Sequence, residues 1–155
     1  MAKLQALWVH GSSVQIEREG YFISKRRTGY GAHFNSHNEP GKGEWFHFAV
    51  PTQVIVDGQK STLIKIFVLY KTELTAKITA VHVYDAGNKI VSFDNLSITG
   101  DHSQSIDQNN SWVIAQVPKM EFGLGISVNV DFGSKNASGV PGIWFRAAGA
   151  DFETP

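Results

Sequence analysis

Cysteine is absent from this chain of 155 residues, and its absence removes several kinds of chemistry together. Disulfide frameworks, thiol nucleophiles and thiolate metal sites all require it. An excess of either charge is also missing, because 14 Lys and Arg residues are balanced by 14 Asp and Glu residues. Proteins that bind nucleic acid through its phosphates carry a marked basic excess. We therefore expect no nucleic-acid partner.

Long hydrophobic runs are lacking as well. No segment approaches the roughly 18 consecutive apolar residues of a membrane-spanning helix, so we expect no membrane partner. Residues 1–8 contain no apolar core of a secretory signal, which predicts a soluble cytoplasmic protein. A secreted mature form, from which the signal has been removed, is the alternative.

Short segments typical of β-strands make up most of what is present. No window carries an apolar stripe of helical period over three turns, whereas β-branched and aromatic clusters recur between turn signals such as Asp57-Gly58. These patterns predict strands near residues 4–10, 12–19, 29–35, 44–50, 52–56, 61–71, 76–84, 89–98, 110–117, 122–132 and 142–152.

Two of these segments are the most informative. Residues 62–70 are apolar on both alternating faces apart from Lys65, which predicts a central strand that is covered on both sides. Residues 122–132 alternate strictly: the even-numbered positions from Phe122 to Phe132 are large and apolar, which predicts a core face, and the odd-numbered positions are small or polar, which predicts a solvent face. The predicted core comprises Leu63, Ile64, Ile66, Phe67, Val68, Leu69, Val81, Val83, Phe93, Val113, Leu124, Ile126, Val128 and Val130.

Many short strands separated by glycine-rich turns predict an all-β fold. We expect one domain over residues 1–155, an antiparallel β-sandwich of the jelly-roll type, with a closed β-barrel as the alternative. In architecture this layout resembles small β-sandwich lectins and carbohydrate-binding modules, although the sequence shares no diagnostic motif with them. The resemblance implies a domain that binds a glycan.

Aromatic residues supply the candidate binding site. Most of the four Trp, four Tyr and ten Phe belong in the core, but Trp45 shares a strand face with His47, and Trp144 shares one with Arg146. An exposed aromatic ring stacks on a sugar ring while neighbouring polar groups bond its hydroxyls. The predicted ligand contacts are Tyr30, Trp45, His47, Asn129, Asp131, Trp144 and Arg146.

Catalytic motifs are missing, since neither a Gly-x-Ser-x-Gly elbow nor a glycine-rich phosphate loop is present. The leading expectation is therefore a non-catalytic module for a small molecule or glycan. One alternative is a small enzyme without a cofactor, in which His47 or His82 acts as general base beside Asp94 or Glu44 in an apolar pocket. Another is a structural protein whose surplus apolar surface is buried in a homo-oligomer.

No cofactor is required by any of these hypotheses. The polar loop at residues 101–111 nevertheless carries Asp107-x-Asn109, which offers two oxygen ligands at a short interval. Calcium prefers such carboxylate and amide oxygens, so Asp107 and Asn109 are the candidate metal ligands. The alternative is a solvated turn between two strands.

Overall fold

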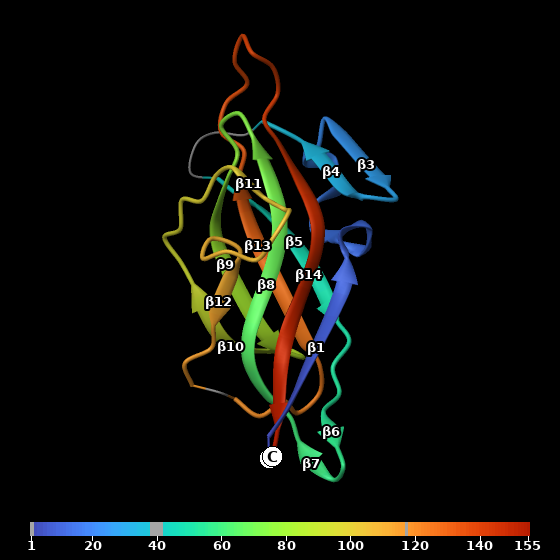
Figure 1. Ribbon diagram of the computed structural model, residues 1–155. Helices are drawn as coiled ribbons and strands as arrows, with labels where there is room; N and C mark the ends of the chain where they lie inside the picture. Colours follow the sequence, from blue (N-terminus) through green and yellow to red (C-terminus); the bar gives the residue numbers. More distant parts are fainter. Residues whose placement is uncertain (1, 38–41, 117) are drawn as a thin grey trace.

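The protein is described by a computed structural model that covers residues 2–37, 42–116 and 118–155 (Figure 1). Its strands form two large antiparallel sheets and a small hairpin. Sheet A contains β1 (Lys3–His10), β3 (Ser24–Thr28), β4 (Gly31–Asn35), β8 (Thr62–Glu73), β11 (Asp101–His102), β12 (Ser111–Val113) and β14 (Gly142–Thr154). Sheet B contains β2 (Gln15–Ile16), β5 (Glu44–Val50), β9 (Lys77–Asp85), β10 (Asn88–Phe93) and β13 (Leu124–Asp131). The hairpin consists of β6 (Ile55–Val56) and β7 (Gln59–Lys60), and two short 3-10 turns span Gly11–Ser13 and Glu19–Tyr21.

The two sheets face each other as the layers of a sandwich. Sheet A has the order β11-β8-β14-β4-β3, with β1 also paired to β14 and β12 to β8. Sheet B has the order β10-β9-β13-β5-β2. In Figure 1, β8 and β14 lie in front of β9, β13 and β5. The predicted all-β antiparallel sandwich is confirmed and is consistent with a jelly roll, whereas the alternative of a closed barrel is wrong.

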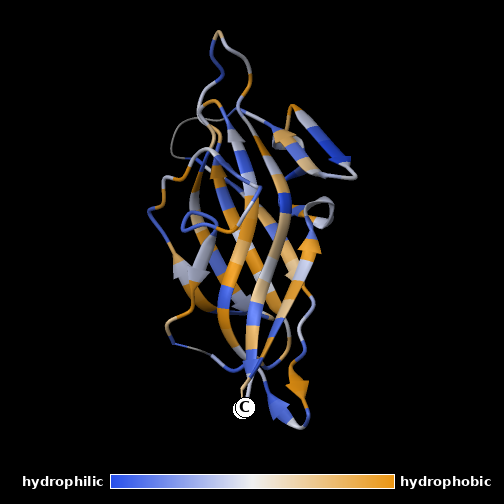
Figure 2. Cartoon of the chain, viewed as in Figure 1, coloured by the Kyte–Doolittle hydropathy of each residue, from blue (hydrophilic) through white to orange (hydrophobic). Residues whose placement is uncertain are grey.

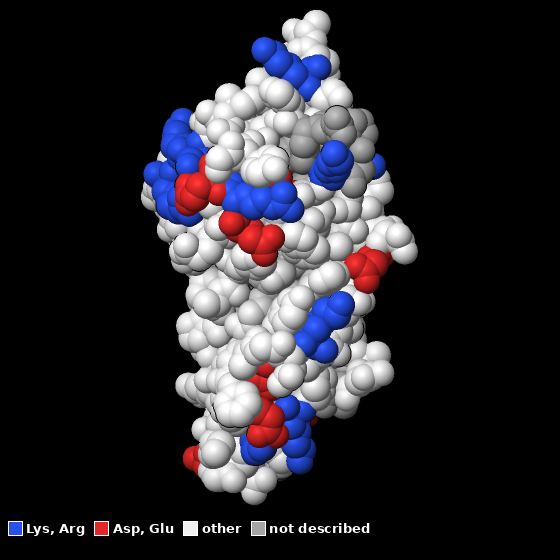
Figure 3. Space-filling view, turned by 180° about the vertical axis from the view of Figure 1, so that it is seen from behind, with Lys and Arg blue, Asp and Glu red and all other residues white. Residues whose placement is uncertain are grey.

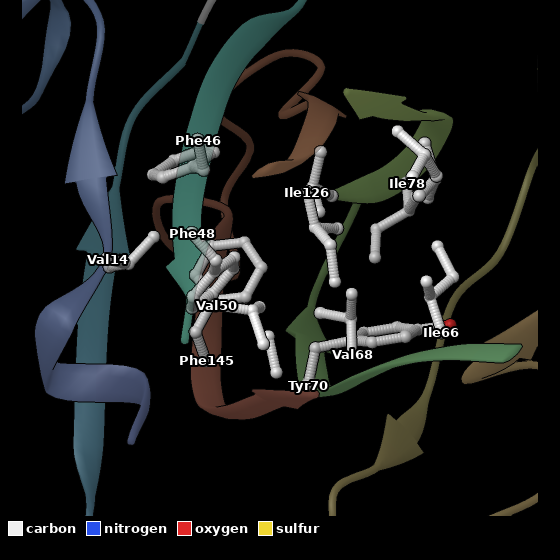
Figure 4. Packing of buried hydrophobic residues seen from close by; sticks show 14 of the residues in the cluster. Val14, Phe46, Phe48, Val50, Ile66, Val68, Tyr70, Ile78, Ile126 and Phe145 are labelled. Atoms are coloured by element: carbon white, nitrogen blue, oxygen red, sulfur yellow. The ribbon is translucent and has the colours of Figure 1, made fainter. Parts of the chain in front are cut away.

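Aromatic side chains join the two layers. Phe46 and Phe48 of β5 contact Phe145 of β14, with ring centroids 4.9 and 5.5 Å apart. Figure 4 shows these rings together with aliphatic side chains of both sheets, and Figure 2 shows the apolar stretches running along the strands. Because both inner faces contribute to one buried cluster, the outer faces remain for solvent and for ligands.

Strand β8 is central in sheet A, as predicted. Its neighbours are β14 on one side and β11 and β12 on the other. Phe67 projects from the outer face of this strand but is buried, because the ring of Trp8 stacks on it at a centroid distance of 5.1 Å. Gly149 lies beneath Trp8, and a Cβ atom at this position would come within 2.4 Å of the indole ring. At Phe67, the outer face of β8 is therefore covered by a side chain of the same sheet.

Two sequence-based predictions about buried side chains are wrong. Val113 is 65% exposed, and its neighbour Trp112 takes the core position at 8%. Phe122 is 70% exposed because β13 begins only at Leu124. Among the other predicted core residues, Ile64, Leu69 and Phe93 are half-buried.

No helix among the described residues is long and apolar enough to cross a membrane.

Candidate ligand-binding groove

The predicted ligand contacts fall into two groups on opposite outer faces of the sandwich. Trp45 and His47 alternate with the buried Phe46 and Phe48, so they project from the outer face of sheet B. Trp144, with Arg146 and Tyr30 beside it, lies on the outer face of sheet A. A single site that contains both groups is therefore excluded by the fold.

A row of polar side chains crosses the middle of sheet B. Ser127 of β13 is paired with His47 of β5 on one side and with His82 of β9 on the other. His47 Nδ1 lies 2.8 Å from Ser127 Oγ, and His47 Nε2 lies 3.0 Å from Glu17 Oε1. At the other end of the row, His82 Nε2 lies 2.8 Å from Asp94 Oδ1. Both imidazoles are thus held in place by carboxylates.

The same row forms the floor of a shallow groove, which we call the β13 groove. Outward side chains on β13 are small, at Gly125 and Ser127, whereas the flanking strands carry larger ones. The Trp45 ring lies 4.7 Å from the His82 ring, centroid to centroid. The resulting hollow has a volume of about 310 Å³ and is lined by Glu17, Trp45, His47, His82, Tyr84, Lys89 and Ser127.

The charges around the groove are mixed. Glu17 and Lys89 both line it, and Figure 3, seen from behind Figure 1, shows basic and acidic side chains interspersed on this side of the molecule. The hydrogen bond with His82, followed by one with Ser92, holds the pKa of Asp94 below its usual value. The surface therefore presents no field of one sign that would select a highly charged ligand.

Part of this arrangement is predictable from the sequence. The sequence predicts Asp94 or Glu44 as the acidic partner of His47 or His82, and in the structure Asp94 is paired with His82. The other acidic candidate, Glu44, is buried at the start of β5, and burial raises the pKa of its carboxyl group. The partner of His47 is Glu17, which reaches it because β2 pairs with β5. Only knowledge of that strand pairing would have revealed it.

Asn129 and Asp131 lie farther along β13 and support local structure. Asn129 Oδ1 accepts a hydrogen bond from Thr79 Oγ1 at 2.8 Å. Gly43 packs against the same amide so closely that a Cβ atom would lie 1.7 Å from Oδ1. Asp131 Oδ1 accepts the N–H of Gly133 at 2.9 Å. Neither Asn129 nor Asp131 lines the β13 groove, and their role as ligand contacts stays a prediction.

The aromatic rings of the group on sheet A contact other side chains of the protein. Trp144 stacks on His33 with centroids 4.5 Å apart, and the Arg146 guanidinium lies 4.4 Å from the Trp144 ring. Arg26 Nη2 donates a hydrogen bond to Tyr30 Oη at 2.8 Å, and Arg146 Nη1 donates one to the Tyr30 carbonyl, also at 2.8 Å. These contacts fasten the β3–β4 hairpin to β14, which leaves less of the Trp144 ring for a ligand.

The predicted calcium ligands lie in a loop that is closed by protein hydrogen bonds. Asp107 Oδ1 accepts the N–H of Asn109 at 2.6 Å, and Asp107 Oδ2 lies 2.9 Å from His102 Nδ1. The Asn109 carbonyl accepts a hydrogen bond from Tyr70 Oη at 2.8 Å. Within the described part of the chain, no three His, Asp or Glu side chains are grouped so as to hold a metal. Calcium binding at Asp107 and Asn109 stays a prediction.

Comparisons with known proteins identify a family without a known activity. The model of a family described as "Family of unknown function (DUF6623)" matches residues 2–153. No curated protein matches the chain. Among solved structures, it is similar to the carbohydrate-binding module CBM36 in complex with calcium and xylotriose. The identity is 9%, the TM-score is 0.36, and the match covers 91% of this chain and 96% of that one. At that distance the similarity says nothing about the ligand of this chain.

Proposed function

The chain belongs to the family of unknown function DUF6623, so we propose a function from the β13 groove alone: non-catalytic binding of a neutral glycan. The observation that carries this proposal is the combination of aromatic rings and fixed polar groups in one hollow. Trp45 and Tyr84 supply apolar faces. Ser127 and Lys89 supply hydrogen-bonding atoms beside them. Sugar rings present apolar C–H faces and polar hydroxyl edges, so this combination matches their chemistry.

Preorganisation supports the proposal. The contacts from Glu17 to His47 and from His47 to Ser127 hold these side chains in one arrangement before a ligand arrives. Less conformational entropy is then lost on binding, because the side chains are already ordered. The mixed charges on this face also favour an uncharged ligand over an acidic or basic one.

The positions of the carboxylates argue against glycoside hydrolysis. That reaction needs two carboxyl groups about 5–9.5 Å apart, one on each side of the scissile bond. Glu17 and Asp94 follow β2 and β10, which are the two edge strands of sheet B. Of the described residues that line the groove, Glu17 is the one carboxylate, because Asp94 lies outside the lining and is bonded to His82. The groove is therefore suited to holding a glycan and not to cleaving it.

The test is a titration of the protein against an array of neutral monosaccharides and linear oligosaccharides, followed by calorimetry of the strongest binder. We expect Trp45→Ala to weaken binding at least tenfold, because one face of the groove is lost. Trp144→Ala is the matched control, since it removes the same side chain from the opposite sheet, and it should leave affinity unchanged. Absence of any bound glycan, or equal affinity of wild type and Trp45→Ala, would reject the proposal.

The contacts among Glu17, His47 and Ser127 favour a second candidate, a hydrolase with Ser127 as nucleophile. Two features weigh against it. Both nitrogens of His47 already have partners, and Ser127 lies within β13, whose backbone pairs with strands on both sides. Paired amides do not form the oxyanion hole that acyl transfer requires. A fluorophosphonate probe separates the candidates: the binding proposal predicts no labelling of Ser127, and labelling that Ser127→Ala abolishes would support the hydrolase.

A further inference from the structure

A second hollow continues the β13 groove along the sheet. Its volume is about 470 Å³, and it shares His47, Tyr84 and Ser127 with the first hollow, so the two are continuous. Beyond these shared residues it passes over Gly125 and reaches Gly123, where the floor consists of small residues and backbone. The outer face of sheet B thus carries a trough that follows β13 and not an isolated pocket.

An exposed aromatic residue is the chain neighbour of the residue at the far end of this trough. Phe122 directly precedes Gly123 and is 70% exposed. Its turn is rigid, because the Asp85 carboxylate accepts the backbone N–H groups of Glu121, Phe122 and Gly123 at 2.7, 3.0 and 3.0 Å. The Ala86 N–H also donates to the Gly123 carbonyl at 2.9 Å. The turn therefore holds the Phe122 ring in solvent beside Gly123, which lines the second hollow.

We propose that the trough binds a linear oligosaccharide along β13, with Trp45 near one end and Phe122 as a stacking residue at the other. This inference rests on the proposed function, because it extends the same groove. From Ser127 to Gly123 the floor of the trough follows four residue steps of the chain, roughly 14 Å at about 3.4 Å per residue. That length exceeds one sugar ring. The ligand is therefore an extended chain of neutral sugars and not a single unit.

The polarity of the trough changes along its length. Charged and imidazole groups line the first hollow, at Glu17, His82 and Lys89, whereas the second is bordered by Ala49, Gly125 and Gly123. The first end therefore selects the sugar through its hydroxyl groups, and the second accepts the apolar face of further units. Affinity should consequently rise with the length of the oligosaccharide, without a large change in the preferred sugar.

The experiment is calorimetry with neutral homo-oligosaccharides of glucose, xylose, mannose, galactose and N-acetylglucosamine, from single units to pentasaccharides. Wild type is compared with Trp45→Ala, with Phe122→Ala, and with Leu4→Ala as control. Leu4 is an exposed apolar residue on β1 of sheet A, whereas the trough lies on sheet B, so its loss mimics Phe122→Ala in kind. Phe122 makes no core contact, and thermal unfolding of each variant verifies that it folds.

In the series that binds, we expect wild-type affinity to rise with each added unit until the trough is filled. Phe122→Ala should lower affinity for the longest oligosaccharides about five- to tenfold and leave the shortest unchanged, as the loss of one aromatic contact predicts. Leu4→Ala should change neither. Two results would refute the extended trough but leave the proposal that the β13 groove binds a glycan intact. One is that single units bind as tightly as pentasaccharides. The other is that Phe122→Ala has no effect while Trp45→Ala weakens binding. If nothing binds in any series, the proposed function fails together with this inference.

Discussion

A substitution at Asp85 gives the sharpest test of what holds the turn at the far end of the trough. The buried carboxylate of Asp85 accepts three backbone N–H groups from the turn at residues 121–123. Asp85→Asn keeps the shape of the side chain but removes the charge and turns one acceptor into a donor. Hydrogen bonds to a charged group contribute roughly 1.5–3 kcal/mol each, and water replaces part of the loss at this exposed turn. We expect the free energy of unfolding in urea at pH 7 to fall by about 2–4 kcal/mol.

The pH dependence of the free energy of unfolding tests the role of Asp85 independently. Burial alone would raise the pKa of Asp85, but the bonds from Glu121, Gly123 and Phe122, together with nearby Lys60, hold it below its usual value. The unfolded chain then takes up this proton at a higher pH than the folded protein does. The stabilisation is therefore present above the unfolded pKa of about 3.9 and is lost as pH falls through the folded pKa. Wild type should lose more stability than Asp85→Asn between pH 5 and pH 2, and equal losses would refute the reasoning.

Three further predictions concern the rest of the sandwich. Phe67→Ala should lower the free energy of unfolding in urea by about 3–5 kcal/mol, because Phe67 is buried beneath Trp8, and an unchanged urea midpoint would contradict that packing. Burial opposes charging of His102, but its contacts with Asp107 and the Thr99 carbonyl raise its pKa overall. The stability that this shift provides is present below pH 6.5 and is lost as pH rises through the pKa of the folded protein. In urea titrations at pH 5 to 9, His102→Gln should abolish this pH dependence. Trp144→Ala should speed amide hydrogen exchange across the β3–β4 hairpin without changing glycan affinity, and unchanged exchange would show that the ring stack does not hold the hairpin.

The architecture was largely readable from local patterns. The strict alternation at residues 122–132 predicted both the core face of β13 and the small residues that now form the groove floor. The alternation continued into Phe122 without marking where the strand begins, because the turn is set by Asp85, which is distant in sequence. β12 has three residues, too few to show an alternating pattern, and the sequence therefore predicts Val113 in the core position that Trp112 occupies.

The candidate site was only partly readable, since it depends on which strands are neighbours. Alternation shows that Trp45 and Trp144 each share a strand face with other residues, but not that their sheets lie on opposite sides of the sandwich. Glu17 belongs to the groove because β2 pairs with β5, and no local motif encodes that pairing. Long-range strand pairing is decided by the packing of the whole core.

The central claim, that the β13 groove holds a glycan, is tested most directly by nuclear magnetic resonance. The indole N–H signals of the four tryptophans are followed while the strongest neutral glycan from the array is added. We predict that the Trp45 indole signal shifts together with the backbone signals of His47 and Ser127, while the Trp144 signal stays in place. Shifts centred on Trp144 and sheet A, or no shifts with any neutral glycan, would contradict the account.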